Sequence, residues 1–253
     1  FGLDSSNFSP LYDLAKIQSN NRINLAIKTY NFIIASSNQE SKAYYEIGVL
    51  FYLQNDIETA ITSFTNSIAL RKDARTFNDR ASCYRMLGDN ELAIKDYITA
   101  IALNSDLAFI YNNLASTYRK QGDSAKALSY YSLAISKDTN YVLAYNNRGS
   151  LHLDLNDIES ALHDINQAIS IDNDYSPAYN NKGVIYHQQK KYTEALSCFD
   201  KAISLHNGYA KALLNRGITR QMLRDEDGAC DDWIKAREFG INIANKYLVN
   251  DCN

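Results

Sequence analysis

Small residues recur along the chain at a nearly constant spacing, each followed by a larger or similar side chain. This series is Ala26, Ala60, Ala93, Ala127, Ala161, Ala195 and Ala229, with steps of 34 residues and one step of 33. Three further series keep the same register: small (Gly48, Ala81, Ala115, Gly149, Gly183, Gly217), mainly aromatic (Tyr44, Phe77, Tyr111, Tyr145, Tyr179, Leu213) and large apolar (Tyr30, Phe64, Tyr97, Tyr131, Ile165, Phe199, Trp233). A period of this length indicates a repeat architecture.

Each period predicts two helices. Tyr111, Ala115 and Tyr118 are spaced to share one helical face, and Ala127 and Tyr131 are spaced to share another. Small residues that face each other let two helices approach closely, while the large residues fill the space beside them. The connectors carry residues suited to a left-handed conformation, followed by aspartates suited to an N-cap. These residues are Asn21, Asn55, Gly88, Gly122 and Asn156, then Asp56, Asp89, Asp123, Asp157 and Asp225.

The units resemble the tetratricopeptide repeat (TPR), a helix-turn-helix repeat of about 34 residues. The resemblance implies an all-α fold, a right-handed α-solenoid of about seven TPR units plus a C-terminal capping helix, forming a single solenoid over 1–253. The unit boundaries expected are 7–40 (degenerate), 41–73, 74–107, 108–141, 142–175, 176–209 and 210–240, with the capping helix at 241–253. The proline usual between such repeats is missing here.

An arginine and an aspartate switch together between repeats. Arg80, Arg148 and Arg216 replace the apolar residue before the small residue of the first helix, and an aspartate follows each after 16 residues. Units without the arginine lack this aspartate. We therefore expect ion pairs between the two helices of one repeat. The alternative is that these arginines line the binding surface. The pairs are Arg80–Asp96, Arg148–Asp164 and Arg216–Asp232.

One polar position of the first helix repeats through five units, as Asp79, Asn113, Asn147, Asn181 and Asn215. First helices line the concave side of TPR proteins, so this row resembles an asparagine ladder that clamps the backbone of an extended peptide. A carboxamide both donates and accepts hydrogen bonds, as a peptide unit does. The alternative is that asparagine is simply frequent at this position. Neighbouring positions expected in the groove are Tyr52, Asn78, Arg85, Phe109, Asn112, Arg119, Asn146, Asn180 and His187.

The last residues predict a cap. Ile243, Ala244, Tyr247 and Leu248 form an apolar stripe after Gly240. If this short helix folds back on the last repeat, Cys230 and Cys252 meet as a disulfide or as two reduced thiols. We leave localisation open between the cytoplasm and, if the disulfide forms, export to a compartment such as the periplasm. Because the chain begins with Phe1 rather than Met, we expect a processed or truncated product.

Composition narrows the functional classes. The net charge of -3 disfavours nucleic acid as the main partner, and no apolar run is long enough for a transmembrane segment. The four histidines and four cysteines form no metal-binding motif, and no catalytic motif is found, so we expect no enzyme activity, metal or cofactor. We predict a scaffold that binds a peptide or protein segment. The alternatives are an oligomerisation module or an accessory fragment of a larger enzyme.

Overall fold

The computed structural model describes residues 8–19, 22–37 and 40–252 of the chain. The described residues are helices joined by short connectors, without strands, and they divide into two compact units, 1–130 and 131–253. In a repeat stack each repeat contacts only its neighbours, so compact units fall along the sequence. The all-α solenoid prediction is confirmed, whereas a single solenoid over 1–253 remains a prediction. The expected start of the first repeat at Asn7 lies outside the described residues.

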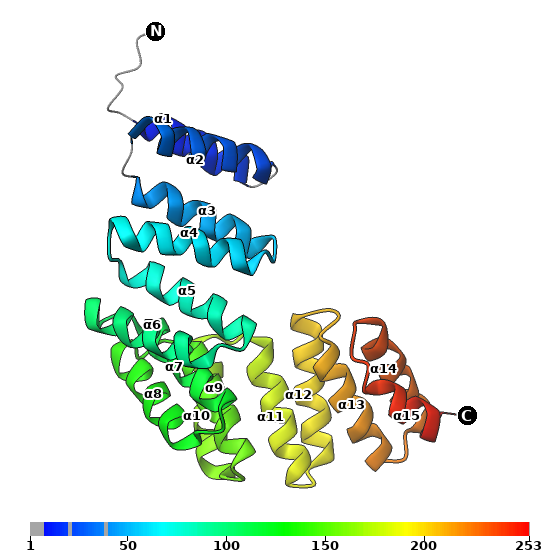
Figure 1. Cartoon of the computed structure of the whole chain (residues 1–253). Helices are drawn as coiled ribbons and strands as arrows, with labels where there is room; N and C mark the ends of the chain where they lie inside the picture. Colours follow the sequence, from blue (N-terminus) through cyan, green and yellow to red (C-terminus); the bar gives the residue numbers. More distant parts are fainter. Residues whose placement is uncertain (1–7, 20–21, 38–39, 253) are drawn as a thin grey trace. The chain divides into compact units, whose positions relative to one another are not determined.

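Figure 1 shows the helices stacked in antiparallel pairs within each unit. The first unit contains α1 (Ser9–Ser19), α2 (Ile23–Ser37), α3 (Ser41–Leu53), α4 (Ile57–Leu70), α5 (Ala74–Leu87), α6 (Asn90–Leu103) and α7 (Ala108–Lys120). Helix α8 (Ser124–Lys137) spans the division. The second unit contains α9 (Val142–Asp154), α10 (Ile158–Ile171), α11 (Ser176–Gln188), α12 (Tyr192–Leu205), α13 (Ala210–Met222), α14 (Glu226–Glu238) and α15 (Ala244–Asp251).

The core of each repeat joins a small residue of the first helix to a large residue of the second. A Cβ atom added to Gly48 would lie 2.6 Å from the ring of Phe64, and one added to Gly183 would lie 2.6 Å from the ring of Phe199. Both rings are almost fully buried. The close helix approach therefore explains why the small and large series keep a common register.

The connectors use the conformations that their residues suggest. Asn55 and Asn156 have φ values of 61° and 60°, and Gly88 and Gly122 also have positive φ; the predicted Asn21 lies outside the described residues. Lys190 and Arg224 take the same left-handed conformation in the sixth and seventh repeats, with φ of 59° and 63°. No residue preference marks these two positions, so the repeat geometry imposes the conformation there.

Most of the aspartates after these residues cap the next helix. Asp56, Asp123, Asp157 and Asp225 each accept a hydrogen bond from the backbone N–H three residues later. The side chain of Asp89 makes no such bond to α6. Asp89 is also exposed.

The C-terminal helix α15 covers the last repeat. Ala244 is fully buried, and the ring of Tyr247 stacks on Trp233 with 4.9 Å between centroids. The expected contribution of Ile243 to this apolar stripe is wrong, since Ile243 is 59% exposed. Helix α15 begins one residue later, at Ala244, so Ile243 lies at its exposed start. Ile241 packs instead on the apolar cluster that contains Trp233 and Ala244.

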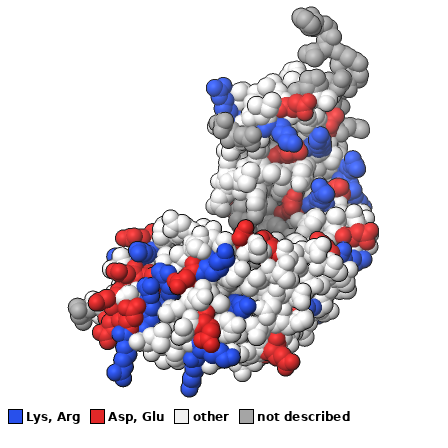
Figure 2. Space-filling view, turned by 180° about the vertical axis from the view of Figure 1, so that it is seen from behind, with Lys and Arg blue, Asp and Glu red and all other residues white. Residues whose placement is uncertain are grey.

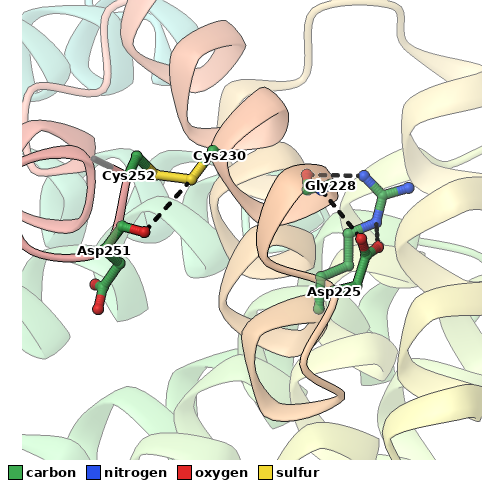
Figure 3. The surroundings of a disulfide bond; sticks show 6 residues. Asp225, Gly228, Cys230, Asp251 and Cys252 are labelled. Atoms are coloured by element: carbon green, nitrogen blue, oxygen red, sulfur yellow. Dashed lines mark hydrogen bonds and ion pairs between the residues drawn. A yellow bond between two sulfur atoms is a disulfide. The ribbon is translucent and has the colours of Figure 1, made fainter.

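A disulfide joins α14 to the residue after α15. Cys230 and Cys252 are bonded with 5.7 Å between their Cα atoms (Figure 3). On the same helix α14, the carbonyl oxygen of Gly228 accepts a hydrogen bond from Nη1 of Arg220, whose Nε lies 3.5 Å from the carboxylate of Asp225. The disulfide fixes the C-terminal helix to the repeat that it covers. None of the described helices is both long and apolar enough to cross a membrane.

Candidate functional site

The three arginine–aspartate pairs link the two helices of a repeat. Nε and Nη2 of Arg80 donate to the carboxylate of Asp96 at 2.7 and 2.9 Å, and Arg148 holds Asp164 with two bonds of 2.7 Å. Arg216 binds Asp232 at 2.8 and 2.6 Å. The three aspartates are buried, so these arginines are structural members of their repeats.

Each arginine also reaches the second helix of the preceding repeat, a contact that the sequence analysis does not anticipate. Its remaining Nη1 group donates to a polar side chain at the same repeat position in all three cases. The acceptors are Thr65 at 3.0 Å, Ser132 at 2.8 Å and Asp200 at 2.6 Å. Hydrogen bonding to Asp164 raises the pKa of Arg148 above its usual value. The guanidinium groups therefore join three helices from two repeats.

We use "inner face" for the surface of the first helices, namely α3, α5 and α7 in the first unit and α9, α11 and α13 in the second. The expected row of asparagines lies there, but Asn113, Asn181 and Asn215 each donate to an asparagine at the neighbouring position of the preceding repeat. Nδ2 of Asn113 donates to Oδ1 of Asn78 in the preceding repeat at 3.0 Å. In the second unit, Asn181 donates to Asn146 and Asn215 donates to Asn180, each at 2.9 Å.

The accepting asparagines are buried, which corrects their expected place in the open groove. Asn78, Asn146 and Asn180 are between 4 and 7% exposed, and Asn112, at the same position of the fourth repeat, is 5% exposed. A buried amide must satisfy its polar atoms inside the protein, and the next asparagine of the sequence supplies a partner. Nδ2 of Asn146 and Asn180 lies 3.5 and 3.4 Å from Oδ1 of the residue that follows each. This row is therefore part of the joint between repeats.

At Asp79 the direction of the ladder reverses. The position that Asn78 holds in its repeat is occupied by Tyr45 in the preceding one, and a tyrosine hydroxyl is a donor. Oη of Tyr45 donates to Oδ2 of Asp79 at 2.9 Å, and Nδ2 of Asn78 donates to its Oδ1 at 2.9 Å. Burial raises the pKa of Asp79 above its usual range. A carboxylate fits here because it accepts both bonds.

A pocket of about 320 Å³ opens beside this network in the first unit. Its walls come from inner-face residues of α3, α5 and α7, with one ring from α4. The lining residues are Tyr45, Val49, Tyr52, Leu53, Phe64, Asn78, Asp79, Ser82 and Asn113. Tyr52 is 38% exposed, and it is the predicted groove residue that remains most open to a ligand here. A volume of this size suits one long side chain or a small molecule.

The remaining predicted groove residues are distributed over both units. Phe109 and Arg119 lie partly buried on α7, and Asn147 lies partly buried on α9. Lys120 donates to the backbone oxygen of Arg85 at 3.1 Å. The structure thus places each of these residues on the first helix of its repeat.

His187 contacts the following repeat. Its Nδ1 atom lies 2.9 Å from Oγ1 of Thr219, its ring packs against Tyr192, and burial lowers its pKa. These contacts orient the imidazole within the second unit. The side chain therefore has a packing role in this structure.

Neither the surface charge nor the titratable groups of the described residues indicate a metal site or a charged binding patch. Figure 2 shows basic and acidic side chains interspersed on the face that it presents. Among the described residues, no group of three or more His, Cys, Asp or Glu side chains has an arrangement for a metal ion. The candidate site is the inner face, whose residues are held in place by contacts between helices.

Solved structures with this fold are numerous. A tetratricopeptide repeat protein from Parabacteroides merdae superposes with a TM-score of 0.75 at 17% identity, covering 97% of this chain and 100% of that one. PilF from Pseudomonas aeruginosa gives 0.70 at 17% identity, over 83% and 96%. YrrB, described as a TPR protein with an unusual peptide-binding site, gives 0.54 at 19% identity, over 73% and 95%. These likenesses concern the fold.

Sequence profiles identify the family. Tetratricopeptide repeat profiles match residues 72–138, 142–175 and 176–209, which together make up more than half of the chain. No curated protein sequence matches it significantly. The matched segments contain small and large residues that set the helix pairs, together with the pairs Arg80–Asp96 and Arg148–Asp164. The chain therefore belongs to the tetratricopeptide repeat family.

Proposed function

We propose that this chain is a non-catalytic scaffold that binds an extended peptide or protein segment along the inner face of its repeats. The observation that carries the proposal is the pocket of the first unit, because its lining comes from the first helices of three successive repeats. A segment lying across those helices contacts each in turn. Proteins of this fold commonly mediate protein–protein interaction.

The asparagine ladder supports this binding, although each amide already uses part of its hydrogen-bonding capacity within the protein. A carboxamide has two N–H hydrogens and an oxygen with two lone pairs, and the bond to the preceding repeat uses one of those hydrogens. The second hydrogen of Asn113 is a donor for a carbonyl of the bound segment, and Asn113 lines the pocket. The ladder thus fixes the amide before the ligand arrives, which lowers the entropic cost of binding.

Substitution of Tyr52 by alanine tests the proposal, because Tyr52 lines the pocket and is exposed enough to be removed without opening the core. The matched control is Leu92→Ala, which removes an exposed side chain from α6, outside the pocket. A partner captured from the source organism by the full chain and by the control is expected to be lost from Tyr52→Ala. Equal capture by both variants contradicts binding at this surface.

A second candidate function is self-association through the first repeat. Four large apolar side chains of α1 and α2 are exposed: Leu14 at 44%, Ile17 at 70%, Leu25 at 39% and Phe32 at 60%. Exposed apolar groups at the end of a repeat array are typical of contact surfaces. Light scattering on the full chain and on the double variant Ile17→Lys, Phe32→Lys distinguishes the candidates, since only self-association predicts a fall in molecular mass.

The disulfide supports a proposal about location. Disulfides persist in oxidising compartments and are rare where thiols are kept reduced. We therefore propose that the chain functions in an exported or periplasmic setting. Trapping free thiols with an alkylating reagent in intact cells of the source organism tests this proposal. Labelling of Cys230 and Cys252 before any reduction would contradict it.

A further inference from the structure

The pocket of the first unit combines apolar and aromatic walls with a single charged side chain. Rings of Tyr45, Tyr52 and Phe64 and the aliphatic groups of Val49 and Leu53 form most of its lining. Asp79 is the one Asp, Glu, Lys or Arg residue among the lining residues. This combination suits an occupant that has both a hydrocarbon part and a positive charge.

The carboxylate of Asp79 is not bound by a guanidinium group, whereas three other aspartates of the repeats are. Asp96, Asp164 and Asp232 each receive two bonds from a guanidinium. Within the described segments, Asp79 receives its hydrogen bonds from the neutral groups of Tyr45 and Asn78. Arg75, one turn earlier on α5, lies near enough to lower the pKa of Asp79 but forms no ion pair with it. A partly buried carboxylate that is held by neutral donors retains an attraction for a cation.

Asp79 also keeps the capacity to bind one. Its two oxygens offer about four lone-pair positions, and the bonds from Tyr45 and Asn78 use one on each oxygen. These two bonds also fix the orientation of the carboxylate. An incoming ammonium or guanidinium group therefore meets an acceptor that is already positioned.

We propose that this pocket binds a lysine or arginine side chain of the extended partner segment, with its cationic group on Asp79. The inference rests on the proposed function and adds the chemistry of the ligand. The hydrocarbon stem contacts Val49 and Leu53, as long basic side chains commonly do on apolar surfaces. The aromatic rings add a cation–π attraction. An aliphatic side chain in the pocket would shield Asp79 from water without pairing it, and an acidic side chain would repel it.

The preceding repeat places a second carboxylate at the equivalent position. Glu46 of α3 holds the position that Asp79 holds in its own repeat, and burial raises the pKa of Glu46 although Lys42 and Lys16 lie near enough to lower it. From the fourth repeat onward the same position is an uncharged asparagine. Charge complementarity therefore favours a segment whose basic residue lies at the N-terminal end of the array, with neutral residues along the asparagines.

Selection from a phage library of random peptides of about twelve residues tests the proposal on the full chain, with the peptides as the probe. The wild type is expected to enrich peptides that share a lysine or arginine at one position. Asp79→Asn is expected to weaken their binding by about tenfold or more. The matched control Asp89→Asn makes the same charge change at an exposed position of the same unit and is expected to leave binding unchanged.

If circular dichroism shows that Asp79→Asn does not fold, a substitution in the peptide tests the inference on the wild-type protein. Replacing the shared basic residue by norleucine keeps the hydrocarbon and removes the charge, and it is expected to cause a similar loss of binding to the wild type. Enriched peptides without a shared basic residue, or equal binding of the norleucine peptide, overturn the inference and leave the proposed function standing. If no peptide is enriched at all, the proposed function fails and the inference fails with it.

Discussion

The hydroxyl group of Tyr45 donates a hydrogen bond to Asp79 across two successive repeats, with 2.9 Å between Oη and Oδ2. Further along the array, an asparagine amide donates in the opposite direction, from the later repeat to the earlier one. The acidic residue at position 79 therefore follows from the donor at position 45. This relationship joins the stability of the first unit to the charge of its pocket.

Substitution of Tyr45 by phenylalanine tests the stabilising part of this contact. The ring remains and the donor is lost, so Asp79 keeps a partly buried charge with one partner fewer. We expect a loss of about 1–3 kcal/mol in the free energy of unfolding, measured in urea. Tyr52→Phe removes the same atom from an exposed ring of the same helix and is expected to change little. Equal stability of the two variants would show that the contact contributes nothing.

The raised pKa of Asp79 predicts a pH dependence. The native state binds the proton more tightly than the unfolded chain, whose carboxyl group titrates near pH ~4. The native state thus carries more protons between these two pKa values. The stability of the wild type relative to Asp79→Asn should therefore fall as pH rises through this window and stay constant above it. Urea unfolding of both proteins across this range measures the difference. A difference that rises with pH contradicts the assigned direction.

The Arg148–Asp164 pair is expected to be strongly coupled, because Asp164 is buried and both bonds to it are short. Removal of one partner leaves the other charge buried alone, at a cost of about 3 kcal/mol. A double-mutant cycle of Arg148→Ala and Asp164→Ala measures the coupling energy. The exposed pair of Lys126 and Asp123 provides the control and is expected to give a much smaller value. Zero coupling in the buried pair contradicts its structural role.

Reduction of the disulfide is expected to lower the thermal stability of the cap. Cys230 and Cys252 close a segment with a sequence separation of 22. A loop of this length corresponds to about 3 kcal/mol in the chain-entropy account. Thermal unfolding with and without a reducing agent, followed by near-ultraviolet circular dichroism of Trp233, reports the change. The variant Cys230→Ser, Cys252→Ser should show no response to the reductant, whereas an equal response in both proteins excludes the disulfide as its cause.

The repeat pattern predicts the helices and their internal contacts because both depend on residues within one period. The spacing of small and large residues anticipates the contact of Gly183 with Phe199, and the joint change of Arg148 and Asp164 anticipates their ion pair. Both arise inside a unit whose geometry is known from its helix-turn-helix form. The helix order and the residues that fill each core could therefore be predicted.

Contacts between repeats could not be predicted in the same way, because they depend on the rotation from one repeat to the next. This rotation brings Asn113 to Asn78, at a separation of 35 residues rather than 34. It also brings the Nη1 group of Arg148 to Ser132. The polar residues at 65, 132 and 200 are a visible signal once the contact is known. The conformations of Lys190 and Arg224 carry no such signal.

The three-way arginine contacts have a consequence for cooperativity. Arg80, Arg148 and Arg216 each tie a repeat to the one before it, which joins the second repeat to the third, the fourth to the fifth and the sixth to the seventh. Leu114 and Lys182 hold the equivalent position in the repeats between. In a linear array, neighbour coupling decides which segments open together. Amide hydrogen exchange is therefore expected to detect opening in steps of two repeats, with the chain coming apart first at the joints that lack a guanidinium.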